Sequence, residues 1–173
     1  MELKTNRLFI RFVNQSDWKS LIEIWDDFNQ SEYARYDVVH TETEAEVQNK
    51  AKRWEEVSPG MEHVFFAVLL ETKMIGYTDF HKTSDGYECG YCFHSKYNGK
   101  GYAKESIEAL IRYLSNGRKM RITAGTALEN APSVRLLKSL GFEKIKEEQV
   151  SFYKDVNGND IYFKGAIFAL DVE

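Results

Sequence analysis

Hydrophobic residues in the first third of the chain follow first a strand-like and then a helical spacing. Residues 8–12 are mostly apolar and predict a first strand. The pattern then predicts a helix that Ser16 caps. Its apolar residues recur every three or four positions: Trp18, Leu21, Ile22, Trp25 and Phe28. Thr43 and Glu46 have the spacing of a capping box, which predicts a second helix through Trp54, and Pro59-Gly60 ends it.

Three strands are expected next, in close succession. Residues 64–70 and 74–80 are rich in apolar and β-branched side chains, and the short turn 71–73 joins them. A turn at residues 84–86 leads into a third strand at residues 87–93. Such short turns predict antiparallel neighbours in one sheet.

The last part of the chain alternates helices and strands. A helical face is formed by Ala103, Ile107, Leu110, Ile111 and Leu114. A strand is expected at residues 121–126, and a short helix follows from Asn130 to Gly141, with a proline in its first turn. Two final strands, near residues 150–154 and 161–170, flank the hairpin turn 157–159.

The resulting order is β-α-α-β-β-β-α-β-α-β-β, which comprises seven strands and four helices. It lacks the regular β-α repetition of a parallel sheet. We therefore predict an α+β fold with a mixed, mostly antiparallel central sheet, formed by one domain over residues 1–173.

Composition excludes several classes of protein. The net charge of −4 argues against nucleic-acid binding, which usually needs a basic excess. No apolar run reaches the ~18 residues that span a bilayer, and charges interrupt the N-terminus where a signal peptide would be apolar. Two cysteines are too few to stabilise a domain of this size by disulfide bonds, which favours a reducing, cytoplasmic setting. We expect no membrane and no nucleic acid as partners.

Negative charge is concentrated in the first third of the chain. Residues 1–60 hold 12 acidic and 8 basic side chains, and this difference of 8 − 12 = −4 equals the whole net charge. Such a region either attracts a cationic partner or is simply a solvated acidic helix face. Four of its acids are candidates for substrate specificity: Asp26, Asp27, Glu32 and Asp37.

The stretch YNGKGYAKE, residues 97–105, is the main candidate for chemistry. Gly99 and Gly101 precede a helix that begins near Tyr102. Amides at a helix start have no intrahelical acceptors and lie at the positive end of the dipole, and glycines let an anion approach them. The loop therefore suits phosphate or pyrophosphate, although the same residues also suit an ordinary turn. The Walker phosphate loop and the dinucleotide-binding motif are absent.

The segment GYCFHSKYNGKGYAKESIEAL resembles the acetyl-CoA signature of the GNAT superfamily, whose loop reads Q/R-x-x-G-x-G/A. Its positions are matched here by Asn98, Gly99, Lys100, Gly101, Tyr102 and Ala103. NAPSVRLLKSLGFEK resembles the second family block. The opening TNRLFIRFVNQSDW and the tail VNGNDIYFKGAIFAL resemble the branch that contains ribosomal-protein N-terminal alanine or serine acetyltransferases. The resemblance implies a GNAT fold and covers nearly the whole chain.

The resemblance implies direct transfer of an acetyl group from acetyl-CoA to an amine. Cofactor contacts are then expected from the main chain of Cys92, Phe93 and His94, and from the loop amides. Asn98 stands where the family has glutamine or arginine, so Lys100 or Lys104 would have to supply positive charge. Asn130 would bind the pantetheine or pyrophosphate region, cap its helix, or do both.

Two residues are candidates for acid–base catalysis. Glu88 is the candidate base, directly or through water, and its alternative role is to orient the loop as a structural residue. Ser133 is the candidate acid for the leaving thiolate, and its alternative roles are helix capping or a cofactor hydrogen bond. We expect His94 to position the loop. One of the ten tyrosines is a further possible acid, but the sequence does not select one.

No metal site is expected. Cys89 and Cys92 form a C-x-x-C pair. Residues three apart on a strand point to opposite faces, and the sequence has no second pair to complete four ligands.

The leading function is an acetyl-CoA-dependent N-acetyltransferase acting on the α-amine of a protein or peptide. The alternatives are acetylation of a polyamine or amino-acid-like molecule, and a non-catalytic module that senses acetyl-CoA. A homodimer is possible by analogy with the branch, but the sequence contains no interface signature.

Overall fold

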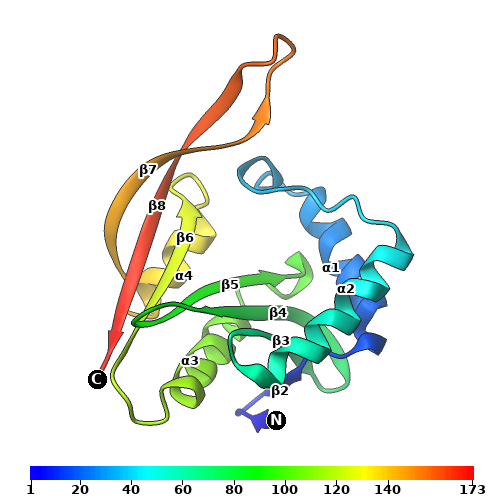
Figure 1. The fold of residues 1–173 in the computed structure, drawn as a ribbon, viewed down its shortest axis with the longest axis vertical. Coiled ribbons are helices and arrows are strands. Elements are labelled where there is room, and N and C mark those ends of the chain that lie inside the picture. The colour runs from blue at the N-terminus through cyan, green and yellow to red at the C-terminus, as the bar shows by residue number, and fades with distance from the viewer.

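The computed structural model describes residues 1–173 and has one eight-stranded sheet with helices on both faces (Figure 1). Its strands are β1 (Glu2–Lys4), β2 (Leu8–Phe12), β3 (His63–Leu70), β4 (Lys73–Lys82), β5 (Gly86–Phe93), β6 (Met120–Ala127), β7 (Glu143–Lys154) and β8 (Asp160–Val172). Their order in the sheet is β1-β2-β3-β4-β5-β6-β8-β7. All neighbours are antiparallel except β5 and β6, which are parallel. The predicted mixed, mostly antiparallel α+β architecture is confirmed.

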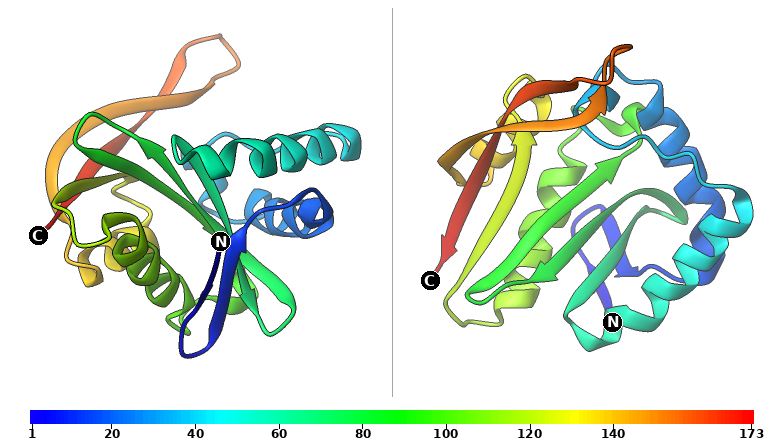
Figure 2. Two further views of the ribbon diagram at one scale, coloured as in Figure 1. Left: turned by 60° about the horizontal axis from the view of Figure 1, so that its bottom comes forward. Right: turned by 45° about the horizontal axis from the view of Figure 1, so that its top comes forward.

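Four α-helices cover the sheet: α1 (Trp18–Asn29), α2 (Glu44–Val57), α3 (Tyr102–Ser115) and α4 (Ala131–Ser139). Figure 2 shows α1 and α2 on one face and α3 and α4 on the other. Short 3₁₀ turns are η1 (Gln15–Asp17), η2 (Ala34–Tyr36), η3 (Ser58–Gly60) and η4 (Ser95–Tyr97). None of the helices is both long and apolar enough to cross a bilayer.

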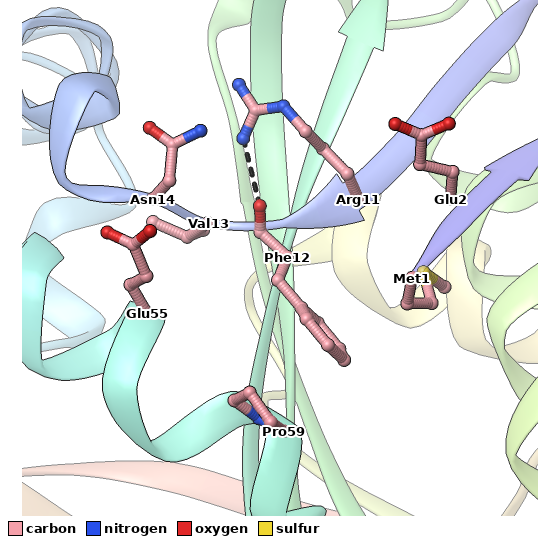
Figure 3. A pocket seen from close by; sticks show the side chains of 8 residues that line it. All are labelled: Met1, Glu2, Arg11, Phe12, Val13, Asn14, Glu55 and Pro59. Atoms are coloured by element: carbon pink, nitrogen blue, oxygen red, sulfur yellow. Dashed lines mark hydrogen bonds between the residues drawn. The ribbon is translucent and has the colours of Figure 1, made fainter.

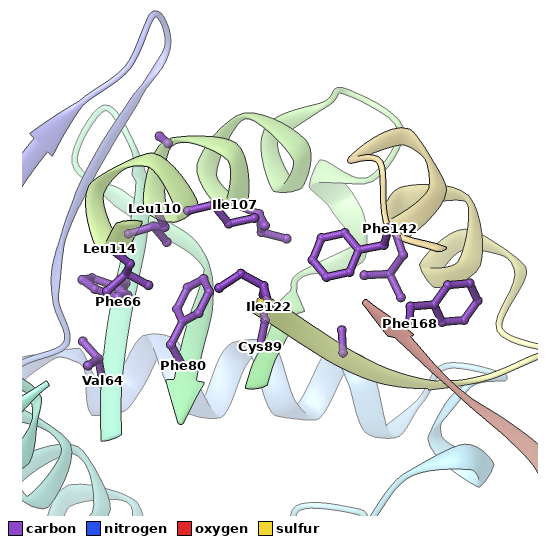
Figure 4. Close-up of a cluster of buried hydrophobic side chains, with 14 of the residues drawn as sticks. Val64, Phe66, Phe80, Cys89, Ile107, Leu110, Leu114, Ile122, Phe142 and Phe168 are labelled. Atoms are coloured by element: carbon purple, nitrogen blue, oxygen red, sulfur yellow. The ribbon is translucent and has the colours of Figure 1, made fainter. Parts of the chain in front are cut away.

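The main core lies between the sheet and α3 (Figure 4). Ile107, Leu110 and Leu114 recur at helical spacing and belong to a cluster with side chains from six strands. The largest fully buried members are Phe66, Phe80 and Phe168. Burying a side chain of this size contributes about 1.5–3 kcal/mol relative to leaving it exposed. A second core, between α1, α2 and the opposite face of the sheet, contains Leu21, Trp25 and Tyr77.

The two cores fix which face each residue of β5 serves. Cys89 belongs to the α3 core, and Tyr91 packs against it, whereas Cys92 packs on the α1–α2 core. Alternation along the strand therefore directs Glu88, Gly90 and Cys92 to the α1–α2 face.

Three details differ from the prediction. Ser16 is not the helix cap: Asn14 caps η1 with a capping box completed by Asp17, and α1 begins only at Trp18. The pattern missed β1, which has only three residues. It also missed the first half of β7, because that edge strand exposes charged residues on both faces and shows no apolar alternation. The Thr43–Glu46 capping box and the turn at Gly158 are confirmed.

Candidate active site

Strands β5 and β6 part in the middle of the sheet. They pair only at Gly86–Arg121, Tyr87–Ile122 and Glu88–Thr123. Beyond that point β5 stays paired with β4, and β6 with β8, so each strand keeps one unpaired inner edge. The two strands diverge visibly in Figures 1 and 2. The gap therefore exposes main-chain donors and acceptors to any molecule that enters it.

The hydrogen bonding of β5 shows which main-chain groups face this gap. The His94 amide donates to the carbonyl oxygen of Ile75 on the β4 side, at 3.0 Å. Because strand hydrogen bonding alternates from one edge to the other, the N–H and C=O of Phe93 and Tyr91 face the gap. Of the three residues expected to contact the cofactor through their main chain, only Phe93 has the right orientation. Cys92 and His94 are directed toward β4, and the sequence-based expectation for their main chains needs this correction.

The glycine loop follows β5 and leads into α3. Gly99 and Gly101 have φ values of 72° and 79°, which favour glycine strongly. A Cβ atom at Gly99 would meet no other atom within 4 Å, and one at Gly101 would meet only an arginine nitrogen of Arg7 at 3.4 Å. The loop surface is thus open on the side of these glycines.

The amides of this loop have no acceptor in the protein. No N–H group from Gly99 to Lys104 donates to a backbone or side-chain oxygen, and no side chain caps the start of α3. Consecutive unsatisfied amides at the positive end of a helix dipole form an anion site. This arrangement fits the pyrophosphate that the sequence predicted at this position, with Lys100 and Lys104 close by in the chain.

Arg7 anchors the loop from the start of β2. Its guanidinium donates to Glu105 through Nε at 2.7 Å and to the Lys100 carbonyl oxygen at 2.9 Å, and it stacks over the Tyr102 ring at 4.6 Å. Thr5 also donates to Glu105, at 2.6 Å. Burial alone would raise the pKa of Glu105, but the hydrogen bonds from Thr5 and Arg7 outweigh it and lower that pKa. Sequence reasoning missed these residues, because nothing local connects them to the loop.

Asp27 holds the other side of the loop. Its carboxylate accepts hydrogen bonds from the Ser95 amide and the Ser95 hydroxyl, both at 2.7 Å. The Nδ1 atom of His94 lies 3.3 Å from both Asp27 Oδ1 and the Lys96 amide. His94 therefore positions the loop, as expected. Asp27, a candidate for substrate specificity in the sequence, instead connects α1 to η4.

Glu88 lies at the point where β5 and β6 part, on the α1–α2 face. Its side chain is exposed and forms no hydrogen bond or ion pair within the chain. Its pairing partner on the neighbouring strand β4 is His81. The Nε2 atom of His81 lies 3.1 Å from Asp79, and its Nδ1 atom lies 3.0 Å from Nδ1 of His63. The Asp79 hydrogen bond raises the pKa of His81. Both histidines are thus engaged, and Glu88 is a free carboxylate.

Gly90 makes room for Asp79 between Glu88 and Cys92. A Cβ atom at Gly90 would lie 2.5 and 2.8 Å from the two carboxylate oxygens of Asp79. The glycine is needed for this close approach, and no local sequence signal identifies Asp79 as its neighbour.

Cys89 and Cys92 point to opposite faces of the sheet, as their spacing predicts. Burial raises the pKa of Cys92 to about 12, so its thiol stays protonated. No group of three His, Cys, Asp or Glu side chains is placed to hold a metal ion.

Ser133 and Asn130 lie where β6 leads into α4. The Asn130 side chain accepts a hydrogen bond from the Ser133 amide at 3.2 Å and thereby caps the helix, which is one of its two expected roles. The Ser133 hydroxyl lies 2.8 Å from the Tyr91 hydroxyl of β5. Burial raises the pKa of Tyr91, which keeps this phenol protonated. Of the ten tyrosines, Tyr91 is the one whose hydroxyl contacts Ser133, the candidate acid.

The β7–β8 hairpin is tied to the connection between α1 and α2. The Tyr153 hydroxyl accepts from the Val39 amide at 3.1 Å and lies within hydrogen-bond distance of the carbonyl oxygens of Ala34, at 3.2 Å, and Asp37. Figure 2 shows the hairpin beside this connection. These contacts fix the hairpin against the segment that follows α1.

A separate surface pocket of about 320 Å³ lies between β2 and the end of α2 (Figure 3). Arg11 borders it and donates to both carboxylate oxygens of Asp17, at 2.7 and 2.8 Å, and to the Phe12 carbonyl oxygen. Arg11 is therefore paired with Asp17, and Glu55 accepts a hydrogen bond from the Gln15 amide at 2.8 Å.

Known proteins support the assignment of the gap and loop to one enzyme family. Residues 7–143 match the family model of the acetyltransferase (GNAT) domain. The chain is 32% identical over 149 residues to YnaD, an uncharacterized N-acetyltransferase of Bacillus subtilis (strain 168), and this covers 83% of the chain and 84% of YnaD.

Solved structures agree. A GNAT-family acetyltransferase from Bacillus anthracis is 27% identical, with a TM-score of 0.75 and 98% of both chains covered. An acetyltransferase from Salmonella typhimurium, which modifies the N-terminal serine of ribosomal protein L7/L12, has the same fold at 14% identity. Its TM-score is 0.82, with 98% of this chain and 97% of that one covered. The chain belongs to the GNAT acetyltransferase family and is an acetyl-CoA-dependent N-acetyltransferase.

Proposed function

We propose that this enzyme acetylates the α-amine of a protein or peptide N-terminus. The observation that carries the proposal is the hydrogen bonding of the ionisable groups on the α1–α2 side of the gap, from which we propose that the amine approaches (the amine side). Glu88 is free there, whereas His81 and His94 are engaged with Asp79 and Asp27. A single carboxylate is a modest base, so the acceptor must lose its proton easily.

The energetic difference between acceptors is large. At pH ~7.4, making an α-amine of pKa ~8 neutral costs under about 1 kcal/mol, whereas an amine of pKa ~10.4 costs roughly 4 kcal/mol. A site without a dedicated histidine base therefore favours α-amines. Two proteins of the same fold act on the N-terminus of ribosomal protein L7/L12, which supports the same acceptor class.

We assign the cofactor to the gap and the glycine loop. The amides from Gly99 to Lys104 would hold the pyrophosphate, and the inner edge of β5, including the main chain of Phe93, would bind the pantetheine arm. Bound there, acetyl-CoA supplies an activated acetyl thioester. Asn98 is exposed directly after η4 and carries no charge, so the loop amides, with Lys100 and Lys104, would hold the pyrophosphate without an arginine.

Glu88 is the proposed base and acts on the amine directly or through one water molecule. Ser133, at the start of α4, is proposed to donate a hydrogen bond to the developing thiolate. A serine hydroxyl is a much weaker acid than a thiol of pKa ~8.5, so it stabilises the sulfur charge by hydrogen bonding rather than by giving up its proton.

A small cationic amine is the second candidate, and one observation favours it. Asp27, Asp37 and Asp79 all lie close enough to Cys92 to raise the pKa of its thiol further, after burial. Asp37 has the largest effect of the three, followed by Asp27 and Asp79, so together these carboxylates give this side of the gap a negative potential that would attract a cation.

The test is acetyl-CoA turnover, followed by thiol release and by mass spectrometry of the products. Peptides with a free N-terminus are compared with the same peptides blocked at the N-terminus but carrying a lysine, and with spermidine. We expect turnover only with the free N-terminus. Turnover of the blocked peptide or of spermidine, without the free peptide, would reject the proposal and favour the second candidate.

Substitution of Glu88 tests its role as the base. Glu88→Gln should lower kcat with the peptide by roughly 10²-fold or more, with the affinity for coenzyme A unchanged. Glu143→Gln, on the exposed face of β7, is the matched control and should leave kcat unchanged. An unchanged kcat in Glu88→Gln across the pH range would show that Glu88 is not the base.

A further inference from the structure

Tyr91 and Ser133 connect the two sides of the gap. Tyr91 lies in the unpaired part of β5, three residues beyond its last pairing with β6, and its side chain is on the α3–α4 face. Ser133 is in the first turn of α4, directly after the unpaired part of β6. Their hydroxyl oxygens are 2.8 Å apart. A hydrogen bond thus crosses from one strand to the far side of the gap, next to the place where a thioester would lie.

The hydrogen-bond capacity of the two groups limits how they are arranged. A hydroxyl has one proton to donate and can accept two hydrogen bonds. The Ser133 amide is already bonded to Asn130, and the Ser133 hydroxyl has no partner in the protein other than Tyr91. Tyr91 is partly buried, and its hydroxyl has no acceptor in the protein other than Ser133. Either hydroxyl can donate in this pair, and only the arrangement in which Tyr91 donates leaves the Ser133 proton available to the gap.

We propose that Tyr91 is a positioning residue for the transfer reaction, because its hydroxyl donates to Ser133 and thereby directs the serine proton into the gap, toward the thioester sulfur. This inference rests on the proposed function of Ser133 and adds the group that orients it. Without the tyrosine hydroxyl, the serine proton is free to rotate away, for instance toward a carbonyl oxygen of the chain.

The chemical balance of the step assigns Tyr91 no net change. The amine nitrogen forms a bond to the acetyl carbon, and the bond from that carbon to sulfur breaks with its electron pair on sulfur. The amine proton leaves through Glu88 or water, and sulfur gains its proton from solvent. Ser133 and Tyr91 keep their own protons throughout, and burial, which raises the pKa of Tyr91, favours this. The pair acts together with the positive end of α4, which also favours charge on sulfur.

The experiment measures the thiol pKa of coenzyme A bound to the protein, from the ultraviolet absorbance of its thiolate across a pH series. It requires no acceptor, so it tests this inference even when the proposed acceptor is wrong. We expect Tyr91→Phe and Ser133→Ala each to raise that pKa by about 0.5–1 unit, which is at the low end for one hydrogen bond to a charged group. The kcat should fall roughly three- to tenfold in each variant, with the affinity for coenzyme A unchanged.

The double variant separates positioning from independent effects. If Tyr91 acts through Ser133, adding Tyr91→Phe to Ser133→Ala changes neither the thiol pKa nor kcat further. Additive effects would overturn the proposal. A large effect of Tyr91→Phe combined with none for Ser133→Ala would also overturn it, because Tyr91 would then contact the sulfur itself.

Tyr87→Phe is the matched control. Tyr87 is on the same strand and the same face, but its hydroxyl donates to the Met61 carbonyl oxygen at 3.1 Å, in the part of β5 that is still paired with β6. It should leave the thiol pKa unchanged. Equal shifts in Tyr87→Phe and Tyr91→Phe would show a general effect on the strand and reject the proposal. If Tyr91→Phe folds poorly in a urea titration, the shift in Ser133→Ala alone decides: no shift rejects the proposal.

Discussion

Glu105→Gln is the substitution that most directly tests how the cofactor loop is held. The Glu105 side chain is only 18% exposed and accepts from Thr5, from the Arg7 amide and from the Arg7 guanidinium. The amide side chain keeps the shape but removes the charge, and its NH₂ group meets donors rather than acceptors. The guanidinium then loses its partner while it still holds the Lys100 carbonyl oxygen.

The magnitude follows from the type of bond and its exposure. A hydrogen bond to a charged group contributes about 1.5–3 kcal/mol, but Arg7 is 46% exposed, so solvent screens part of this. We expect a loss of roughly 1–2 kcal/mol in the free energy of unfolding, or about 2–8 °C in Tm for a chain of this size. Loosening the loop should also weaken binding of coenzyme A by roughly three- to tenfold.

Stability should depend on pH in a way that identifies the carboxylate. The folded protein lowers the pKa of Glu105, so the ionised group stabilises the fold above its unfolded pKa. This contribution is lost as the pH falls through the lower, folded pKa. The difference in unfolding free energy between wild type and Glu105→Gln should therefore be largest near neutral pH and shrink in acid.

Glu108→Gln is the matched control, one turn further along α3. Its only partner is Lys104 at 3.7 Å, and both side chains are more than two-fifths exposed. Such a pair contributes about 0.3–0.5 kcal/mol. Urea unfolding and calorimetric titration with coenzyme A are measured for both variants. Equal losses in the two variants, or a difference that persists in acid, would refute the view that Glu105 anchors the loop.

Two further substitutions test the amine side of the gap. Gly90→Ala should cost about 1–3 kcal/mol in unfolding free energy, because its Cβ would overlap the Asp79 carboxylate, and adding Asp79→Ala should recover part of that loss; no recovery in a urea titration would locate the strain elsewhere. Tyr153→Phe removes the hydroxyl that ties the β7–β8 hairpin to the α1–α2 connection and should raise KM for the amine several-fold without changing the affinity for coenzyme A. Tyr162→Phe, whose hydroxyl is exposed on the same hairpin, is its control, and equal effects on KM would contradict the role of Tyr153.

The parts of the site that the sequence predicted are those formed by residues close together in the chain. Gly99 and Gly101 have positive φ values, a conformation that glycine adopts readily. Asn130 caps the helix that follows it. These features depend on backbone geometry and on hydrogen bonds within a few residues, which composition and spacing describe directly.

The parts that the sequence missed are side-chain pairs between distant segments. Arg7 and Glu105 are 98 residues apart, and Tyr91 and Ser133 are 42 apart. Such pairs form only after the sheet has brought their elements together, and no local pattern records them. The orientation of the Cys92 main chain was missed for a related reason, because the strand edge that a residue faces depends on its pairing partner.

Strand β5 places side chains near both reacting groups. One group is the thiolate that leaves the acetyl carbon, and the other is the amine that attacks it. The pleat of β5 directs Tyr91 to the α3–α4 face and Glu88 to the opposite face, because they are an odd number of positions apart. On the proposed function, the hydroxyl pair that stabilises the leaving sulfur and the carboxylate that takes the amine proton thus come from one strand but lie on opposite sides of the sheet. The gap is the only place where both sides are accessible together, since elsewhere neighbouring strands close the sheet. Closing the gap by one more pair of ladder bonds beyond Glu88 and Thr123 would therefore separate the two halves of the chemistry, even with every side chain retained.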